Sequence, residues 1–281
     1  MTTTVEPSRL REPERRALES LQGTGIALIP FDELVGDAAL WDDLATQVQA
    51  FAEEVQDRAP RDADRPMRKD DYLIRRFGGA RAVRDGEPLT ALTPDDPWLR
   101  LGTCDPVLNV VNVYREQWTR LVDLDAWYTV PFAAGQERIA SQRWHRDPED
   151  HHVVKMFVYF SDVDEDAGPF EYVAGSAARA PKIRHGLLGS LRLPWNRRRR
   201  YPPLEYVDKR IERSEVITAT GRPGTMILCD TSGLHRGGFA RRKPRVLTTH
   251  TYVSGAAPAP RGFTVSGDID GLSEPGRAAL R

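Results

Sequence analysis

The chain has 281 residues and balances 40 Lys and Arg against 41 Asp and Glu, a net charge of -1 that excludes nucleic-acid binding by overall charge. Its two cysteines, Cys104 and Cys229, fit no CxxC spacing, which excludes a disulfide framework and a thiolate metal site. The first 20 residues lack the apolar core of a secretory signal and no stretch reaches the roughly 18 apolar residues of a membrane span, so we expect a cytoplasmic protein without membrane contact.

The N-terminal part of the chain predicts helices, loops and one early strand. We expect a flexible N-terminus over 1–20 that runs into a short helix over 14–22, followed by a strand over 25–31. Apolar residues then recur at alternating steps of three and four, which predicts an amphipathic helix over 38–56 behind an N-cap at Asp37. The apolar stripe consists of Trp41, Leu44, Val48, Phe51 and Val55.

The middle of the chain changes character at about residue 120. The polar segment 57–96 predicts a long surface excursion with one strand-like piece at 70–77, and 97–118 predicts a helix. Short strands separated by turns follow, which favours an antiparallel sandwich or jelly roll over a parallel α/β sheet. The expected strands cover 121–130, 139–146, 153–160, 169–174, 214–220, 225–229 and 245–253.

We therefore expect a single domain over 1–281. A helical and loop flank over 21–120 precedes a jelly-roll core over 121–254, and a C-terminal tail follows over 255–281. A basic insertion over 181–214 interrupts the core.

One strand-like segment carries a pattern typical of a metal site. His145 and Asp147 are two residues apart, so on a strand both side chains would point to the same face. His235 follows another strand far downstream. Two histidines and a carboxylate that leave three coordination positions open form the facial triad of non-haem Fe(II) oxygenases. A jelly roll can bring such distant residues together.

An arginine at the start of a later strand adds to this pattern. Arg245 opens the apolar segment 245–253, where a buried guanidinium needs an anionic partner. Its planar fork matches a carboxylate, such as that of a dicarboxylate cosubstrate.

In combination these residues resemble the phytanoyl-CoA dioxygenase family of Fe(II)/2-oxoglutarate oxygenases. The resemblance covers roughly residues 20–253 and rests on His145-x-Asp147, on Gly168 to Ser176, and on His235-Arg236-Gly237-Gly238 with Arg245 ten residues after His235. The chain departs from the family at Ala174 and Ala177, where a proline and a histidine are usual, and at Leu247, where related oxygenases often have a hydroxyl.

The resemblance implies a mainly β fold, a double-stranded β-helix of the cupin-like jelly-roll type with flanking N-terminal helices. It implies His145, Asp147 and His235 as iron ligands, and Arg245 as the partner of the C5 carboxylate of 2-oxoglutarate. With O2, such a site oxidises a C–H bond and releases succinate and CO2. Because halogenating relatives carry a small residue in place of the aspartate, Asp147 favours hydroxylation, desaturation or ring chemistry over halogenation.

Two further residues are candidates for contact with a bound ligand. Lys155 interrupts an apolar run, so it either reaches water at a strand edge or contacts the cosubstrate or substrate. His151 lies in an expected turn, where it is either solvated or a neighbour of the substrate.

The insertion 181–214 contains ten Lys or Arg and three acidic residues. It is either a solvated insertion or a cationic flap that recruits an anionic or carrier-linked small molecule, with Trp195 as a candidate substrate contact. Stacking of Trp195 and Tyr201 on nucleic acid is a third and less favoured alternative.

Three classes of function remain open. The favoured one is an Fe(II)/2-oxoglutarate-dependent dioxygenase that hydroxylates an unactivated C–H bond of a small molecule. The second is a Zn-dependent hydrolase or lyase that uses the same two histidines and aspartate, in which Arg245 would have no evident task. The third is a jelly-roll binding protein without catalysis.

Overall fold

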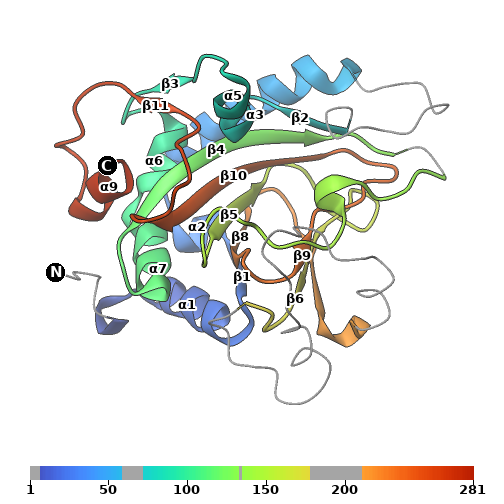
Figure 1. Cartoon of the computed structure of the whole chain (residues 1–281), viewed down its shortest axis with the longest axis horizontal. Coiled ribbons are helices and arrows are strands. Elements are labelled where there is room, and N and C mark those ends of the chain that lie inside the picture. The colour runs from blue at the N-terminus through green and yellow to red at the C-terminus, as the bar shows by residue number, and fades with distance from the viewer. Residues whose placement is uncertain (1–6, 59–71, 133–134, 178–210) are drawn as a thin grey trace.

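The computed structural model describes residues 7–58, 72–132, 135–177 and 211–281 (Figure 1). Its α-helices are α1 (Glu12–Thr24), α2 (Phe31–Leu34), α3 (Ala38–Val55), α5 (Gly79–Asp85), α6 (Pro97–Thr103), α7 (Asp105–Arg115) and α9 (Glu274–Ala279), and its 3-10 helices are η1 (Pro7–Arg9), η2 (Gln56–Arg58), η3 (Ala140–Gln142) and η5 (Arg213–Glu215). Its strands are β1 (Ile26–Pro30), β2 (Leu73–Arg75), β3 (Ala91–Leu92), β4 (Thr119–Thr129), β5 (Val154–Tyr159), β6 (Phe170–Val173), β7 (Val216–Ala219), β8 (Thr225–Asp230), β9 (His235–Arg236), β10 (Arg245–Ser254) and β11 (Thr264–Val265). None of the helices in these ranges is long and apolar enough to cross a lipid bilayer.

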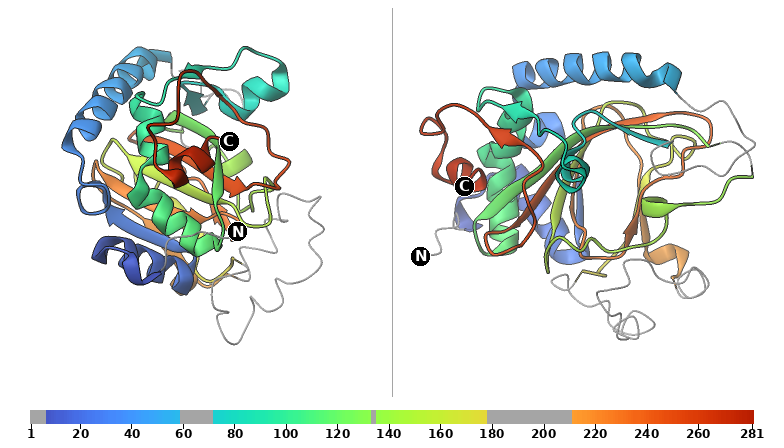
Figure 2. Two further views of the ribbon diagram at one scale, coloured as in Figure 1. Left: turned by 90° about the vertical axis from the view of Figure 1, so that its left-hand side faces the viewer. Right: turned by 45° about the horizontal axis from the view of Figure 1, so that its top comes forward.

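Two antiparallel sheets form the centre of the fold. The large sheet has the strand order β1-β8-β5-β10-β4-β2, and the small sheet has the order β7-β6-β9. The strands curve around a common interior, and α3 lies outside them (Figure 2). This arrangement is a jelly roll with flanking helices, so the predicted fold class is confirmed.

Helices cover the outer face of the large sheet (Figure 1). Alternate residues of β4, Leu124, Ala126 and Tyr128, lie in the same apolar core as residues of α1, α3, α6 and α7. This core follows from the period of two along the strand, which places every second side chain toward the helices. Each fully buried Leu or Val contributes about 1.5–3 kcal/mol, so most of the apolar stabilisation lies on this side of the sheet.

Helix α3 shows how the local sequence determines one of these covering elements. It runs from Ala38 to Val55, and the Asp37 side chain accepts a hydrogen bond from the Leu40 backbone N–H at 2.9 Å. That bond satisfies one of the N–H groups left without a partner at a helix start. Leu44 and Val48 are fully buried on the predicted stripe. The predicted helix and its cap are confirmed.

The inner face of the large sheet meets the small sheet. Phe157 and Tyr159 of β5 and Leu247 of β10 pack with Phe170 and Tyr172 of β6 in a second apolar core. Residues two positions away from Phe157 on β5, or from Leu247 on β10, lie on the same face of the strand and therefore point into the interior between the sheets.

Two predicted elements differ in the structure. The helix expected over 97–118 is broken into α6 and α7, because Pro106 has no N–H and its ring would clash with a carbonyl one turn earlier. The strand expected over 139–146 is also absent from the described structure. Residues 140–142 form η3, and His145 makes a single bridge with His235.

The structure adds detail to the expected division of the chain. The segment 1–20, predicted to be flexible, contains most of α1, which buries Leu18 and Leu21 against the rest of the molecule. The flank 21–120 supplies β1 and β2, the two edge strands of the large sheet. The tail 255–281 adds β11, which pairs with β3, and α9. Residues 181–210 of the basic insertion, including Trp195, lie outside the described residues.

Candidate metal centre

Three predicted ligands meet between the two sheets. One ligand atom from each of His145, Asp147 and His235 lies within 4.8 Å of the others, and all three residues are buried. Backbone hydrogen bonds bring the two segments together: His145 and His235 exchange N–H···O bonds of 2.8 and 3.0 Å, and the Asp147 N–H donates to the Thr231 carbonyl at 2.9 Å. The convergence that the sequence predicted is therefore present, although a loop and not a strand carries His145 and Asp147.

The two histidines present the same nitrogen to the centre. Nδ1 of His145 lies 2.8 Å from the Arg143 carbonyl oxygen, and Nδ1 of His235 lies 3.0 Å from the Gly233 carbonyl oxygen. Because a carbonyl only accepts, Nδ1 of each ring carries the proton and donates. Each Nε2 of a neutral ring is then an acceptor, as metal binding requires.

The carboxylate lies between these nitrogens. Oδ1 of Asp147 is 3.7 Å from His145 Nε2, and Oδ2 is 3.5 Å from His235 Nε2. Burial alone would raise the pKa of Asp147, but its neighbours, above all the ammonium of Lys155, hold it well below its usual range. Burial lowers the pKa of His235, which favours its neutral form. One ionised carboxylate and two imidazoles whose Nδ1 atoms donate to carbonyl oxygens fit a divalent metal ion.

Lys155 lies against this carboxylate. Its Nζ is 2.8 Å from Asp147 Oδ2 and 3.9 Å from Glu149 Oε1, and 14% of its side chain is exposed. Burial lowers the pKa of Lys155, but the carboxylates of Asp147 and Glu149 together raise it by more, so the pKa lies above its usual value. The sequence suggested either escape to water or contact with a ligand. The structure places the Lys155 ammonium against Asp147, one of the three predicted metal ligands.

Arg245 is a buried cation on the inner face of β10. It is 4% exposed, and its Nη1 donates to the Gly168 carbonyl at 2.6 Å. Among the described residues no carboxylate forms an ion pair with it, and its buried Nε has no hydrogen-bond partner. A buried guanidinium without a counter-ion is costly, so this position is suited to an anionic ligand.

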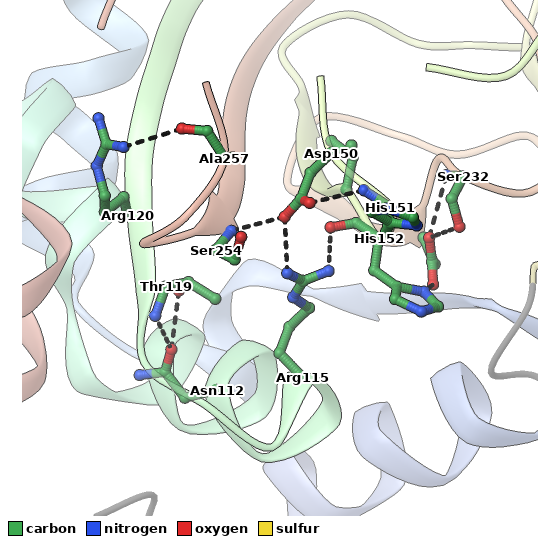
Figure 3. Close-up of polar contacts among 12 residues, drawn as sticks. Asn112, Arg115, Thr119, Arg120, Asp150, His151, His152, Ser232, Ser254 and Ala257 are labelled. Atoms are coloured by element: carbon green, nitrogen blue, oxygen red, sulfur yellow. Dashed lines mark hydrogen bonds and ion pairs between the residues drawn. The ribbon is translucent and has the colours of Figure 1, made fainter. Parts of the chain in front are cut away.

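A buried polar network anchors the loop that carries Asp147 (Figure 3). Arg115 at the end of α7 forms an ion pair of 2.9 Å with Asp150, and it also donates to the His152 carbonyl oxygen. Asp150 Oδ2 accepts the Ser254 N–H at 2.8 Å. The network joins helix α7, this loop and the end of β10.

Asp230 extends the same network to the segment that carries His235. Its Oδ2 accepts the Tyr114 hydroxyl at 2.9 Å and lies 3.5 Å from His152 Nδ1, while its Oδ1 accepts the Ser232 N–H at 3.0 Å. Sequence analysis missed Arg115 and Asp230. Neither residue belongs to a short motif, and their partners lie far away in the sequence.

The other predicted ligand contacts have different outcomes. His151 is exposed on the loop, as expected for a solvated turn, and its backbone N–H donates to Asp150 Oδ1 at 2.6 Å. Its neighbour His152 instead contacts Asp230. Trp195 lies outside the described residues.

Comparison with known proteins gives a likeness of fold. No family model and no curated protein matches the sequence. Apo EctD from S. alaskensis is 19% identical with a TM-score of 0.54, over 99% of this chain and 92% of that chain. AviO1 from Streptomyces viridochromogenes Tue57 is 16% identical with a TM-score of 0.52, over 92% and 100%.

A third solved structure is SnoK from nogalamycin biosynthesis, described as a non-heme alpha ketoglutarate dependent carbocyclase. It is 14% identical with a TM-score of 0.52, over 94% of this chain and 97% of that chain. EctD has also been crystallised with bound Fe, and separately with 2-oxoglutarate and 5-hydroxyectoine. At these identities the likeness shows a shared fold.

Proposed function

We propose that this chain is an Fe(II)/2-oxoglutarate-dependent oxygenase, similar to the phytanoyl-CoA dioxygenase family, that oxidises a small molecule. The observation that carries the proposal is the convergence of His145, Asp147 and His235 in the same interior that Arg245 enters without a carboxylate partner among the described residues. The shared fold with EctD and SnoK, which are iron or alpha-ketoglutarate proteins, supports it.

Each residue of the centre has a distinct task in this proposal. Nε2 of His145, Nε2 of His235 and the carboxylate of Asp147 would hold Fe(II), and the Nδ1 hydrogen bonds keep both rings in the required orientation. Arg245 would hold the C5 carboxylate of 2-oxoglutarate. Fe(II), 2-oxoglutarate and O2 bound together supply the oxidising power to break a C–H bond, with succinate and CO2 as products.

We propose hydroxylation of an unactivated C–H bond as the outcome. The carboxylate of Asp147 supports it over halogenation, because a halogenating centre needs space for a halide where this chain has a metal ligand. Loss of water from the buried site also protects a reactive centre from side reactions.

We propose a small-molecule substrate, anionic or carrier-linked, in a cytoplasmic protein without membrane or nucleic-acid partners. The positive charge of 181–214 supports an anionic substrate, since it would raise the local concentration of anions. Trp195 within that segment remains the proposed aromatic contact for the substrate.

Titration with Fe(II) and 2-oxoglutarate tests whether the three residues and Arg245 bind these two ligands. Anaerobic addition of Fe(II) and 2-oxoglutarate should produce the visible charge-transfer band of the iron chelate in the wild type. His235→Ala should lose the band because one ligand is gone. Arg245→Ala should keep the band but require at least tenfold more 2-oxoglutarate, since a charge-assisted contact to the C5 carboxylate is lost.

Arg242→Ala is the matched control, because Arg242 lies three residues before Arg245 but its side chain is 77% exposed and pairs with Asp166. It should titrate like the wild type. A band that persists unchanged in His235→Ala, or no band in the wild type, would contradict the proposal. Zn-dependent turnover without 2-oxoglutarate would instead support a hydrolase or lyase, and binding without turnover would support a non-catalytic jelly roll.

A further inference from the structure

The side chain of Lys155 is directed at the carboxylate of the metal centre. It belongs to the inner face of β5, because it lies two and four residues before Phe157 and Tyr159, which are in the core between the sheets. Its cross-strand neighbours are Thr251 of β10 and Cys229 of β8. An ammonium at such a position costs free energy unless anionic groups compensate it. The 2.8 Å contact with Asp147 supplies that compensation.

This contact limits how Asp147 can bind a cation. A carboxylate can bind a metal through one oxygen or through both. Because Nζ of Lys155 lies beside Oδ2, the oxygen that remains for the metal is Oδ1. Binding through one oxygen, together with Nε2 of His145 and His235, leaves three positions of an octahedral ion open.

The same ammonium affects the binding of the metal ion and the binding of the cosubstrate in different ways. A fixed positive charge beside the site repels a divalent cation and attracts a dianion such as 2-oxoglutarate, and in a buried site both effects exceed their size in water. The two effects have opposite signs. A residue that served only to fill space would not separate them.

We infer that Lys155 is a positioning residue of the metal centre: it restricts Asp147 to one-oxygen binding, weakens metal affinity and strengthens binding of the dianionic cosubstrate. This inference rests on the proposed function. It differs from a direct contact between Lys155 and 2-oxoglutarate, which would leave the affinity for the metal alone unchanged.

The test replaces Lys155 with Met, which keeps an unbranched side chain, shorter by the terminal nitrogen, and removes its charge. Co(II) serves as the probe metal, and its visible absorption reports both affinity and coordination. Lys155→Met should bind Co(II) about tenfold more tightly, with altered absorption as Oδ2 joins the coordination. The Co(II) form should then bind 2-oxoglutarate at least fivefold more weakly. Lys155→Arg should restore part of both effects because it keeps the charge.

Lys243→Met is the matched control, because Lys243 also pairs with an aspartate, Asp164, but is 54% exposed. It should leave both affinities unchanged. Unchanged Co(II) affinity with weaker 2-oxoglutarate binding in Lys155→Met would overturn the inference in favour of direct contact. Weaker binding of both, with a lower melting temperature, would overturn it in favour of a structural role.

Failure of the proposed function gives a different result. In that case the wild type binds Co(II), but 2-oxoglutarate does not change its spectrum. Tighter Co(II) binding by Lys155→Met would still support the positioning of Asp147. A wild type that does not bind Co(II) would overturn both the function and the inference.

Discussion

Asp125 is a buried carboxyl group on β4 whose environment disfavours ionisation. Its Oδ1 accepts the N–H groups of Arg76 and Phe77 at 3.0 and 2.9 Å, while its buried Oδ2 has no hydrogen-bond partner among the described residues. Burial raises the pKa of Asp125 to about 7, against a smaller opposing effect of the Phe77 N–H and of Arg75. The unfolded chain ionises this group near 3.8. Its contribution to stability is therefore full below about pH 4 and is lost as the pH rises to about 7.

Asp125→Asn should remove this pH dependence, because the amide keeps Oδ1 as an acceptor and does not ionise. Between pH 4 and pH 8 the free energy of unfolding should shift by roughly 2–4 kcal/mol in favour of the variant. Urea unfolding at several pH values measures it. The exposed Asp42→Asn serves as the control and should follow the wild type. Parallel pH profiles for Asp125→Asn and wild type would contradict the assigned shift.

At this scale the sequence predicted residue types better than partners. His145, Asp147 and His235 could be found because metal chemistry restricts which side chains serve and because their spacing is short or follows a strand. For Lys155 the sequence left escape to water and contact with an anion as alternatives, because an apolar run does not say what lies opposite its one charge. For His151 the sequence left a solvated turn and a substrate neighbour as alternatives, because the loop at 147–153 is set by distant contacts with α7 that no local pattern shows.

The end of helix α7 holds the loop that carries Asp147, and Arg115 makes the connection. The guanidinium and Asp150 are buried, with side-chain exposures of 2% and 9%. Removal of one partner from a buried ion pair leaves the other charge uncompensated, which typically costs about 3–5 kcal/mol. Arg115→Met should therefore lower the free energy of unfolding by about that amount.

The same variant should also weaken metal binding, because the loop from Asp147 to His152 loses its anchor. We expect at least a tenfold loss of Co(II) affinity under conditions where the variant is folded. Arg100→Met is the control, since its pairs with Asp37 and Asp43 are exposed and contribute at most about 1 kcal/mol. Urea unfolding and Co(II) titration measure the two effects. Full metal affinity in a folded Arg115→Met would show that the loop keeps its geometry without α7.

Elements with strong local signals could be predicted, and those set by distant contacts could not. Helix α3 follows from its apolar period and its cap, and β5 and β10 follow from their apolar runs. The segment 139–146 has strand-like composition, but in the structure its backbone pairs with β9 only at His145. Strand β9 is two residues long, which is too short for any periodic pattern.

In the whole molecule the metal centre and the main core lie on opposite faces of the large sheet. The helices pack against Leu124, Ala126 and their neighbours, whereas His145, Asp147 and His235 lie on the side of the small sheet. The core therefore does not depend on the metal for its packing. This separation explains why apolar pattern and turns predicted an antiparallel sandwich or jelly roll, while the centre, and the resemblance that implied flanking helices, needed the identity of particular residues.

The separation also predicts what metal removal does. Treatment with EDTA should leave the far-UV circular dichroism unchanged, because the helices and the large sheet keep their core. Co(II) at one hundred times its Kd should stabilise the folded chain by about 2.7 kcal/mol, since only the folded chain gathers the three ligands. The melting temperature should rise by several degrees in the wild type. His145→Ala should keep the apo spectrum and lose the rise, whereas loss of helical signal on EDTA treatment would show that the metal supports the core itself.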